Sequence, residues 1–305
     1  MRIIFFGTPE YATPYFKVLH RAGLSPIAAI TQPDRPVGRK QVITPTPVKA
    51  LAQEIGIPVL QPENVNNEQF LRTLREYKSD LFVVVAFGQI LSKDLLSIPV
   101  SAINVHPSLL PRHRGPAPLQ ETILQGDTET GVTIMLMDEK MDHGPILAQV
   151  RFDVDRNETL SSLKDKTHIA GVELLIRTIQ NISTIKPTEQ DHSQATYTRL
   201  LTRDSGNIDF TSVTAQHADR MIRALNPWPG TWTEWRGKRI KLLQAHPEVA
   251  GHPDSRPGDF IGAGNDLAIC CKDGFLAIDR IQPEGKKPMT GEEFIRGYLS
   301  SHSKK

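Results

Sequence analysis

The chain of 305 residues has only two cysteines, Cys270 and Cys271, and they are neighbours. Both fall in a segment with the pattern of a β-strand, where consecutive side chains point to opposite faces and cannot easily bridge each other. A fold held together by disulfides is therefore not indicated. Free thiols are typical of the reducing cytosol, so we expect a cytoplasmic protein.

Long hydrophobic runs and a strong excess of charge are also missing. The longest purely apolar run, Leu81–Phe87, is far shorter than the ~20 residues that span a bilayer. The opening segment Met1–Gly7 has too short an apolar core for a signal peptide. The net charge is only +2, so any contact with a nucleic acid must come from a local basic patch. We expect no membrane association.

Two common functional motifs do not occur. Gly7-Thr-Pro follows the first predicted strand but lacks the second glycine that would let the backbone approach a pyrophosphate, which disfavours dinucleotide binding. The chain has neither a His-Glu-x-x-His motif nor a cluster of Cys and His at metal-binding spacing. We therefore expect no metal.

The first 185 residues do show an alternation of strand and helix patterns. Apolar residues at helical spacing, such as Val48, Leu51 and Ile55, indicate amphipathic helices, and short apolar runs between turn residues indicate buried strands. This alternation predicts an α/β domain at residues 1–185, with a doubly wound, mostly parallel, Rossmann-like sheet. The expected strands are Ile3–Phe6, Ile27–Ile30, Leu81–Phe87, Ala102–Val105 and Val132–Met137, and the expected helices are Pro9–Ala22, 47–55, 70–77 and 169–179.

A second domain is expected after a polar, aperiodic linker at residues 186–205. Residues 206–305 begin with a predicted helix and continue as short strands separated by glycine turns, which is typical of a small, OB-like β-barrel. The strip Arg236–Lys241 is locally basic, which is consistent either with an ordinary charged hairpin or with a patch that contacts RNA. The expected elements are a helix at Thr211–Leu225, strands at Thr231–Trp235, Arg239–Leu243, Asp259–Ile261, Leu267–Cys271 and Phe275–Ile281, and a terminal helix at Thr290–Leu299 that opens with a capping-box spacing.

Three residues carry the groups that acyl transfer to an amine requires. Asn104 can donate a hydrogen bond to an oxyanion, His106 can handle the proton, and Asp142 can orient the imidazole. Ligands of open parallel sheets bind beyond the carboxyl ends of the strands. We expect Asn104 and His106 at the end of one strand, Asp142 after a second and Gly88–Leu91 after a third, so that three loops meet at one crevice.

Each of these residues alone is weak evidence. An Asn-x-His at a strand end is more often a hydrogen-bonded turn, and a single loop aspartate is usually just solvated. Together with the rigid segment Pro107–Pro111 and with Gly144-Pro145, however, the three residues favour a functional site.

Several segments resemble the methionyl-tRNA formyltransferases, a family that uses 10-formyltetrahydrofolate. The set formed by Asn104–Pro111 and Asp142 is common to the wider group of enzymes that use this folate. The opening Gly-Thr-Pro-Glu, the loop Thr31–Lys49 and the second domain point to the tRNA-specific family. The resemblance runs nearly end to end and is carried by Gly7–Ala12, Thr31–Pro36, Ala86–Leu91, Asn104–Pro111 and Met137–Gly144.

The resemblance implies that Asn104, His106 and Asp142 are the catalytic trio and that 10-formyltetrahydrofolate is the cosubstrate. His106 would move a proton from the attacking amine towards the folate nitrogen or, as an imidazolium, stabilise the oxyanion, and Asp142 would set its tautomer. The loop 138–142 would help to hold the pterin. The implied folate-binding residues are Ser108, Leu109, Leu110, Pro111, Gly88, Gln89, Ile90 and Leu91.

The implied acceptor is methionyl initiator tRNA. The loop Pro33–Lys49 has four basic residues and one acid, and it is longer than the about 2–6 residues usual for a βα connection. In the family this loop meets the acceptor end of the tRNA, so Arg39 and Lys40 are the candidate tRNA-binding residues. Two alternatives remain: formylation of another amine, such as an amino sugar nucleotide, and a non-catalytic RNA-binding protein with the same fold. We expect a monomer.

Overall fold

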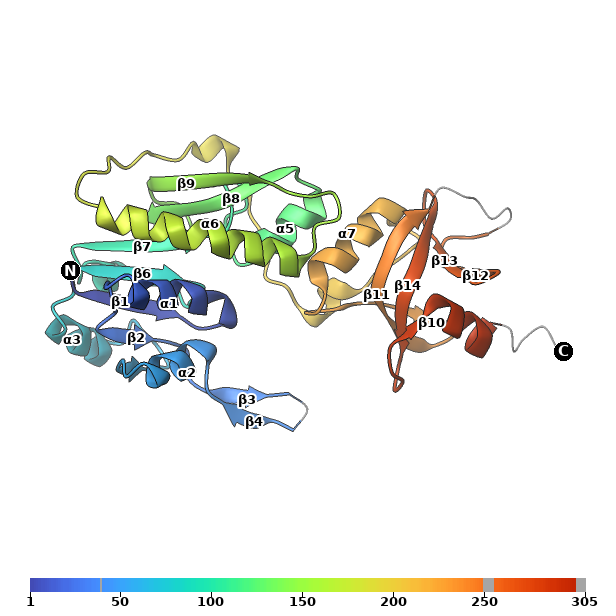
Figure 1. Cartoon of the computed structure of the whole chain (residues 1–305), viewed down its shortest axis with the longest axis horizontal. Helices are drawn as coiled ribbons and strands as arrows, with labels where there is room; N and C mark the ends of the chain where they lie inside the picture. The colour runs from blue at the N-terminus through green and yellow to red at the C-terminus, as the bar shows by residue number, and fades with distance from the viewer. Residues whose placement is uncertain (39, 249–254, 300–305) are drawn as a thin grey trace. The chain divides into compact units, whose positions relative to one another are not determined.

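The structure is a computed structural model that describes residues 1–38, 40–248 and 255–299 (Figure 1). The chain divides into two compact units. The first consists of Met1–Pro118, Glu129–Asp153 and Leu163–Thr198, and the second of Leu119–Thr128, Val154–Ser162 and Arg199–Lys305. The domain boundaries that we expect at residues 185 and 205 stay predictions.

A seven-stranded sheet forms the centre of the first unit, in the order β5-β2-β1-β6-β7-β8-β9. The first five strands of this order are parallel, whereas β8 and β9 run antiparallel to their neighbours. A mostly parallel α/β sheet is thus confirmed. The strands are β1 (Ile3–Gly7), β2 (Ala28–Ile30), β5 (Val59–Leu60), β6 (Leu81–Val85), β7 (Ser101–His106), β8 (Glu129–Leu136) and β9 (Ile146–Asp153).

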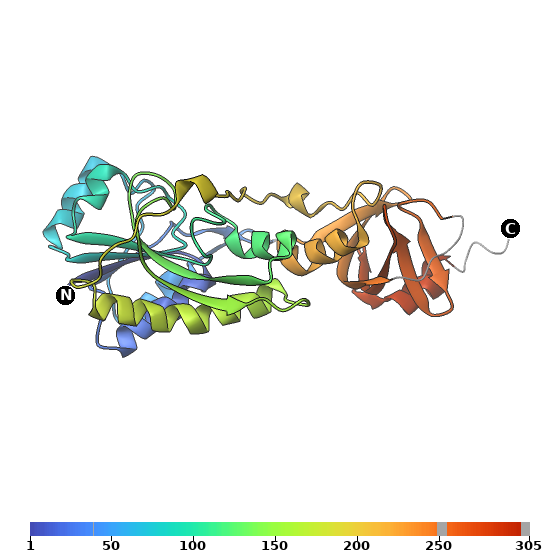
Figure 2. The same cartoon turned by 90° about the horizontal axis from the view of Figure 1, so that it is seen from above.

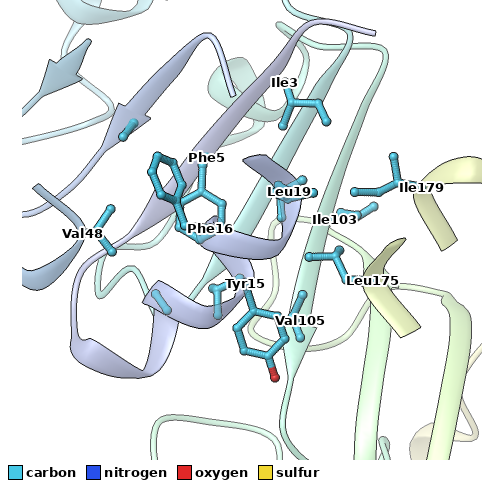
Figure 3. Packing of buried hydrophobic residues seen from close by; sticks show 14 of the residues in the cluster. Ile3, Phe5, Tyr15, Phe16, Leu19, Val48, Ile103, Val105, Leu175 and Ile179 are labelled. Atoms are coloured by element: carbon cyan, nitrogen blue, oxygen red, sulfur yellow. The ribbon is translucent and has the colours of Figure 1, made fainter. Parts of the chain in front are cut away.

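Helices cover both faces of this sheet (Figure 2). On one face, α1, α2 and α6 pack against alternate strand residues, and Figure 3 shows Phe5 of β1 and Val105 of β7 in this core. On the other face, α3 and α4 pack against the residues in between, such as Ala102. Because Ile103 and Val105 face α6, Asn104 and His106 lie on the α3 side. The helices on this sheet are α1 (Thr13–Arg21), α2 (Pro47–Glu54), α3 (Glu68–Glu76), α4 (Lys93–Leu96) and α6 (Leu160–Gln180), whereas nearly all of α5 (Pro118–Gln125) belongs to the second unit.

Strand β9 and a hairpin in the loop Pro33–Lys49 are among the features of the first unit that were not predicted. Strand β9 is a half-exposed edge strand, and its mixed polar and apolar residues lack the continuous apolar run that marks β6. The loop Pro33–Lys49 contains a hairpin of β3 (Arg35–Val37) and β4 (Val42–Thr44), and all its strand residues are exposed. Exposed strands bury no face, so they leave no alternating pattern in the sequence.

The second unit contains an antiparallel sheet in the order β10-β11-β14-β13-β12, with β15 beside β14. Its path ends at β10 and β12, so the expected OB-like barrel is present as a curled, open half-barrel. Helix α7 packs Ala218 and Ile222 into its core. The elements are α7 (Ala215–Leu225), β10 (Thr231–Trp235), β11 (Lys238–Glu248), β12 (Phe260–Ala263), β13 (Asp266–Cys270), β14 (Phe275–Pro283), β15 (Met289–Thr290), α8 (Gly291–Phe294) and a π-turn at Ile295–Leu299.

The predicted helix ends in this unit are right in one case and wrong in another. Thr290 and Glu293 form the expected capping box, with each side chain bonded to the other's backbone N–H. Helix α7 begins at Ala215 and not at Thr211, because the Asp209 carboxylate accepts from the backbone and hydroxyl of Thr211 and holds these residues in a turn.

Cys271 gives this unit a testable dependence on pH. Burial, with Asp273 nearby, raises the pKa of the Cys271 thiol to about 12. An unfolded thiol ionises near pH ~8.5, so above that pH the unfolded chain loses a proton that the folded chain keeps. We expect the unfolding free energy of the protein to fall more steeply between about pH 9 and 11 than that of Cys271→Val. Denaturant unfolding at several pH values would measure both free energies. If the two free energies changed in parallel with pH, the expectation would be contradicted.

Candidate active site

The predicted trio comes together in the first unit. Asn104 and His106 are two residues apart on β7 and therefore share a face of the sheet, and the loop between β8 and β9 places Asp142 against both. The Asn104 Nδ2 donates to Asp142 Oδ1 over 3.1 Å, and His106 Nδ1 lies 3.6 Å from the same oxygen. The side chains of His106 and Asp142 are only 5% and 11% exposed, so their charges and dipoles are weakly screened.

Asp142 does not reach the site in the way we expected. Strand β8 is antiparallel to β7, with Thr133 opposite His106 and Leu136 opposite Ile103, so β8 ends at the far end of β7 from His106. The loop after β8 must fold back to bring Asp142 to the trio, and Asp142 itself has a left-handed φ of 50°. Asn104 likewise lies inside β7 and not beyond its end.

Gly144 makes this return of the loop possible. A Cβ at this position would lie 2.0 Å from the backbone oxygen of Leu136, so only glycine lets the loop pass so close to the end of β8. The path of the loop therefore depends on a residue that has no side chain to take part in chemistry.

The proton positions on His106 follow from its partners. Nε2 lies 2.9 Å from the backbone oxygen of His113, and because a carbonyl can only accept, Nε2 carries the hydrogen. In the neutral ring Nδ1 is then the basic nitrogen, and it faces Asp142. The expectation that Asp142 sets the tautomer is wrong, because the carbonyl of His113 does so. Asp142 is placed to stabilise a proton taken up at Nδ1.

Asp142 is held by two donors. Its Oδ2 accepts from the backbone N–H of Gly115 over 2.7 Å, while Oδ1 accepts from Asn104. Gly115 has φ +113°, and a Cβ there would lie 2.7 Å from the Thr198 hydroxyl. The bond with Asp142 also fixes the Asn104 amide, since only its NH₂ group can face a carboxylate.

Much of the segment Ser108–Pro111 is turned inward. The Ser108 hydroxyl donates to the backbone oxygen of Arg112 over 2.6 Å, and Leu110 is buried. Thr133 lies opposite His106 on β8. Its hydroxyl accepts from the backbone N–H of Leu110 and donates to the backbone oxygen of Ser108. Side chains of Leu109 and Pro111 stay partly exposed, so Ser108 and Leu110 shape the segment from within.

The segment Gly88–Leu91 follows β6 and is anchored in a similar way. Gln89 accepts from Val65 N and donates to the Gln32 side chain, and Leu91 is buried in the core on the α3 side. Ile90, in contrast, is 68% exposed. Lys93, just beyond this segment, pairs with Glu139 over 3.5 Å, which brings the segment close to the loop that carries Asp142.

Two of the described basic residues in the loop Pro33–Lys49 are ion-paired. Arg35 pairs with Glu63, and Lys49 pairs with Asp34 over 2.5 Å, which holds the pKa of the Asp34 carboxyl below its usual value. Lys40 lies exposed at the turn and makes no hydrogen bond or ion pair within residues 1–38, 40–248 and 255–299. Arg39 lies outside the described residues.

Sequence reasoning missed residues that support the trio. Gln190 lies in the segment expected as a linker, yet its amide donates to the backbone oxygens of Asp142 and Gly144. In the same segment Thr196 hydrogen bonds with His113 and Arg114, and Thr198 with Arg114. No periodicity or motif in this polar stretch indicates such contacts.

Neither a candidate membrane span nor a candidate metal site occurs in residues 1–38, 40–248 and 255–299. No helix there is long and apolar enough to cross a membrane. No three His, Cys, Asp or Glu side chains of those residues are grouped so that they could hold a metal ion. The expected absence of a metal stays a prediction.

Both units are similar to domains of known proteins. A family model described as "Formyl transferase" matches residues 1–179, and one described as "Formyl transferase, C-terminal domain" matches residues 200–299. The chain is 44% identical over 302 residues to methionyl-tRNA formyltransferase of Desulfotalea psychrophila, which covers 97% of this chain and 93% of that protein. It is 41% identical over 301 residues to methionyl-tRNA formyltransferase of Bacillus subtilis, covering 97% and 94%.

Among solved structures, an N-formyltransferase from Helicobacter canadensis in complex with folinic acid and dTDP-3-aminofucose has a similar fold. The TM-score is 0.65 at 20% sequence identity, and the match covers 91% of this chain and 98% of that one. At this identity the likeness supports the fold alone.

Proposed function

The chain belongs to the formyl transferase family, and we propose that it transfers the formyl group of 10-formyltetrahydrofolate to the α-amino group of methionyl initiator tRNA. The observation that carries this function is the pairing of an intact Asn104–His106–Asp142 trio with near full-length identity above 40% to methionyl-tRNA formyltransferases. An intact trio also argues against a non-catalytic RNA-binding protein.

The geometry suggests a role for each member of the trio. The acceptor amine attacks the formyl carbon, a C–N bond forms, and the carbonyl oxygen becomes negative. The Asn104 amide has two N–H groups, one of which is bonded to Asp142, and the second stabilises this oxyanion. His106 takes the amine proton at Nδ1, and Asp142 stabilises the imidazolium. The bond between the formyl carbon and the folate nitrogen then breaks, and that nitrogen receives the proton from His106.

Folate binding is supported by the two segments beside the trio. Ile90 and Met141 are 68% and 51% exposed, although both lie in loops that are otherwise anchored to the fold. Exposed apolar side chains next to polar reacting groups suit a flat, partly aromatic cosubstrate such as a pterin. We assign Gly88–Leu91, Ser108–Pro111 and the loop 138–142 to this cosubstrate.

One experiment tests the acceptor. The protein would be incubated with 10-formyltetrahydrofolate and, separately, methionyl initiator tRNA, uncharged tRNA with free methionine, or an amino sugar nucleotide, and formyl incorporation would be followed. We expect incorporation only with methionyl-tRNA. Formylation of the amino sugar nucleotide but not of methionyl-tRNA would replace the proposed acceptor with the alternative one.

We propose that Arg39 and Lys40 are the residues of the loop Pro33–Lys49 that contact the tRNA. Since Lys40 has no partner among the described residues, its ammonium is available to a phosphate. We expect Lys40→Glu to raise KM for methionyl-tRNA and to reduce the slope of log KM against log salt by about one, with little change in kcat. Lys17→Glu, an exposed change on α1, is the control. An unchanged salt slope in Lys40→Glu would exclude this contact.

The second unit is proposed to add further tRNA contacts through the strip Arg236–Lys241. Arg236 and Arg239 lie over the rings of Trp235 and Trp232, at 4.3 and 3.7 Å, so both guanidinium groups are held by cation–π contacts. We also propose a monomer in the cytoplasm, where the free cysteines would stay reduced.

A further inference from the structure

Gln190 is a buried amide that connects the segment 186–198 to the catalytic loop. It is 4% exposed, and its Nε2 donates to the backbone oxygens of Asp142 and Gly144 over 3.0 and 2.7 Å. These oxygens lie on either side of His143. One side chain thus fixes the backbone on both sides of the turn in which Asp142 has its left-handed φ.

Arg114 holds Gln190 from the other side. Its Nη2 and Nε donate to Gln190 Oε1 over 2.7 and 3.2 Å, and the residue is only 1% exposed. The amide oxygen of Gln190 is therefore fully used, which leaves its NH₂ group directed at the loop. Arg114 also precedes Gly115, whose backbone N–H binds the Asp142 carboxylate. Both the backbone and the side chain of Asp142 are consequently held from residues 114, 115 and 190.

A pair of stacked imidazoles completes this arrangement. His192 accepts from Arg114 at Nδ1 over 2.8 Å, since a guanidinium can only donate, and its ring stacks on His143 at 4.0 Å between centroids. His143 Nδ1 in turn donates to Asp138 Oδ2 over 2.6 Å. Asp138 and His143 belong to the same loop as Asp142, so the stack joins this loop to Arg114 by a second route.

We propose that Gln190 and Arg114 are positioning residues that hold the Asp142 carboxylate against His106 Nδ1 and Asn104. Gln190 touches none of the trio's reacting groups, so its effect passes through the backbone of Asp142. This inference rests on the proposed function, because it concerns the step in which Asp142 stabilises protonated His106. Displacement of a catalytic group by about 1 Å can lower a rate by ~10²-fold.

The test is a double-mutant cycle between Gln190→Met and Asp142→Asn, measured as kcat and KM for methionyl-tRNA and 10-formyltetrahydrofolate. Gln190→Met alone is expected to lower kcat by about 10- to 100-fold and to leave both KM values within about twofold. In the Asp142→Asn background, Gln190→Met is expected to lower kcat by less than about twofold, because no carboxylate remains to be positioned. Gln194→Met, an exposed change four residues along, is the matched control.

A second variant separates positioning from a purely structural role. Gln190→Glu keeps the side-chain length and pairs with Arg114, but it has no N–H to donate to the loop. We expect Gln190→Glu to melt near the wild-type temperature and to lose kcat as Gln190→Met does. Full activity in a folded Gln190→Glu, or additive losses in the double mutant, would overturn the proposal. Wild-type kcat in Asp142→Asn would instead contradict the proposed function of the trio.

Discussion

His106→Ala is expected to lower kcat for formyl transfer to methionyl-tRNA by about 10²- to 10⁴-fold, the range for loss of a general base. His106 is the residue whose basic nitrogen faces a carboxylate, since its Nε2–H is bonded to the backbone of His113 and its Nδ1 faces Asp142. Without it the attacking amine has no placed proton acceptor. The loss should appear in kcat, because the segments assigned to folate are held by other residues.

Single-turnover rates with saturating folate and methionyl-tRNA would measure this effect. His20→Ala, which removes an exposed imidazole from α1, is the control and should behave as the wild type. Folate affinity measured separately should stay within about twofold in both variants, which would show that His106→Ala is folded. Turnover close to wild type in His106→Ala would remove the general base from the mechanism.

Sequence reasoning named Asn104 and His106 as residues at the end of one strand, and the structure places both within β7. Asn104 and His106 lie two residues apart in a strand, and the period of a strand puts them on one face whatever the rest of the fold does. Asp142 was found for a reason that does not hold. Its strand β8 is antiparallel, and the loop returns to the trio only because Gly144 permits a close passage and Gln190 fixes its backbone.

The contacts of Gln190 that support the trio could not be predicted, because they join residues far apart in the sequence. Gln190 bonds to Arg114 across 76 residues, and nothing in the polar segment around it has the periodicity that marks a helix or strand. The exposed β3–β4 hairpin escaped prediction for a related reason, since neither strand buries a face. Local sequence patterns indicate which residues are buried. The Gln190 contacts depend instead on long-range polar interactions, and the hairpin strands are not buried at all.

Asn104→Leu is the second substitution with a large expected effect, a loss of about 10²- to 10³-fold in kcat, or roughly 2.7–4 kcal/mol of transition-state stabilisation. Leucine keeps nearly the same size but donates no hydrogen bond. It therefore removes the N–H proposed for the oxyanion and, at the same time, the donor that Asp142 Oδ1 accepts over 3.1 Å.

These two losses can be separated, because they act on different groups. If Asn104 served only to hold Asp142, then Asn104→Leu would cost little in the Asp142→Asn background, as is expected for Gln190→Met. A donor to the oxyanion acts on the substrate and not on Asp142, so most of its effect should persist in that background. We therefore expect the double variant to have a kcat at least about 10-fold lower than that of Asp142→Asn alone, measured in single turnovers. A difference below about twofold would reduce Asn104 to a positioning role.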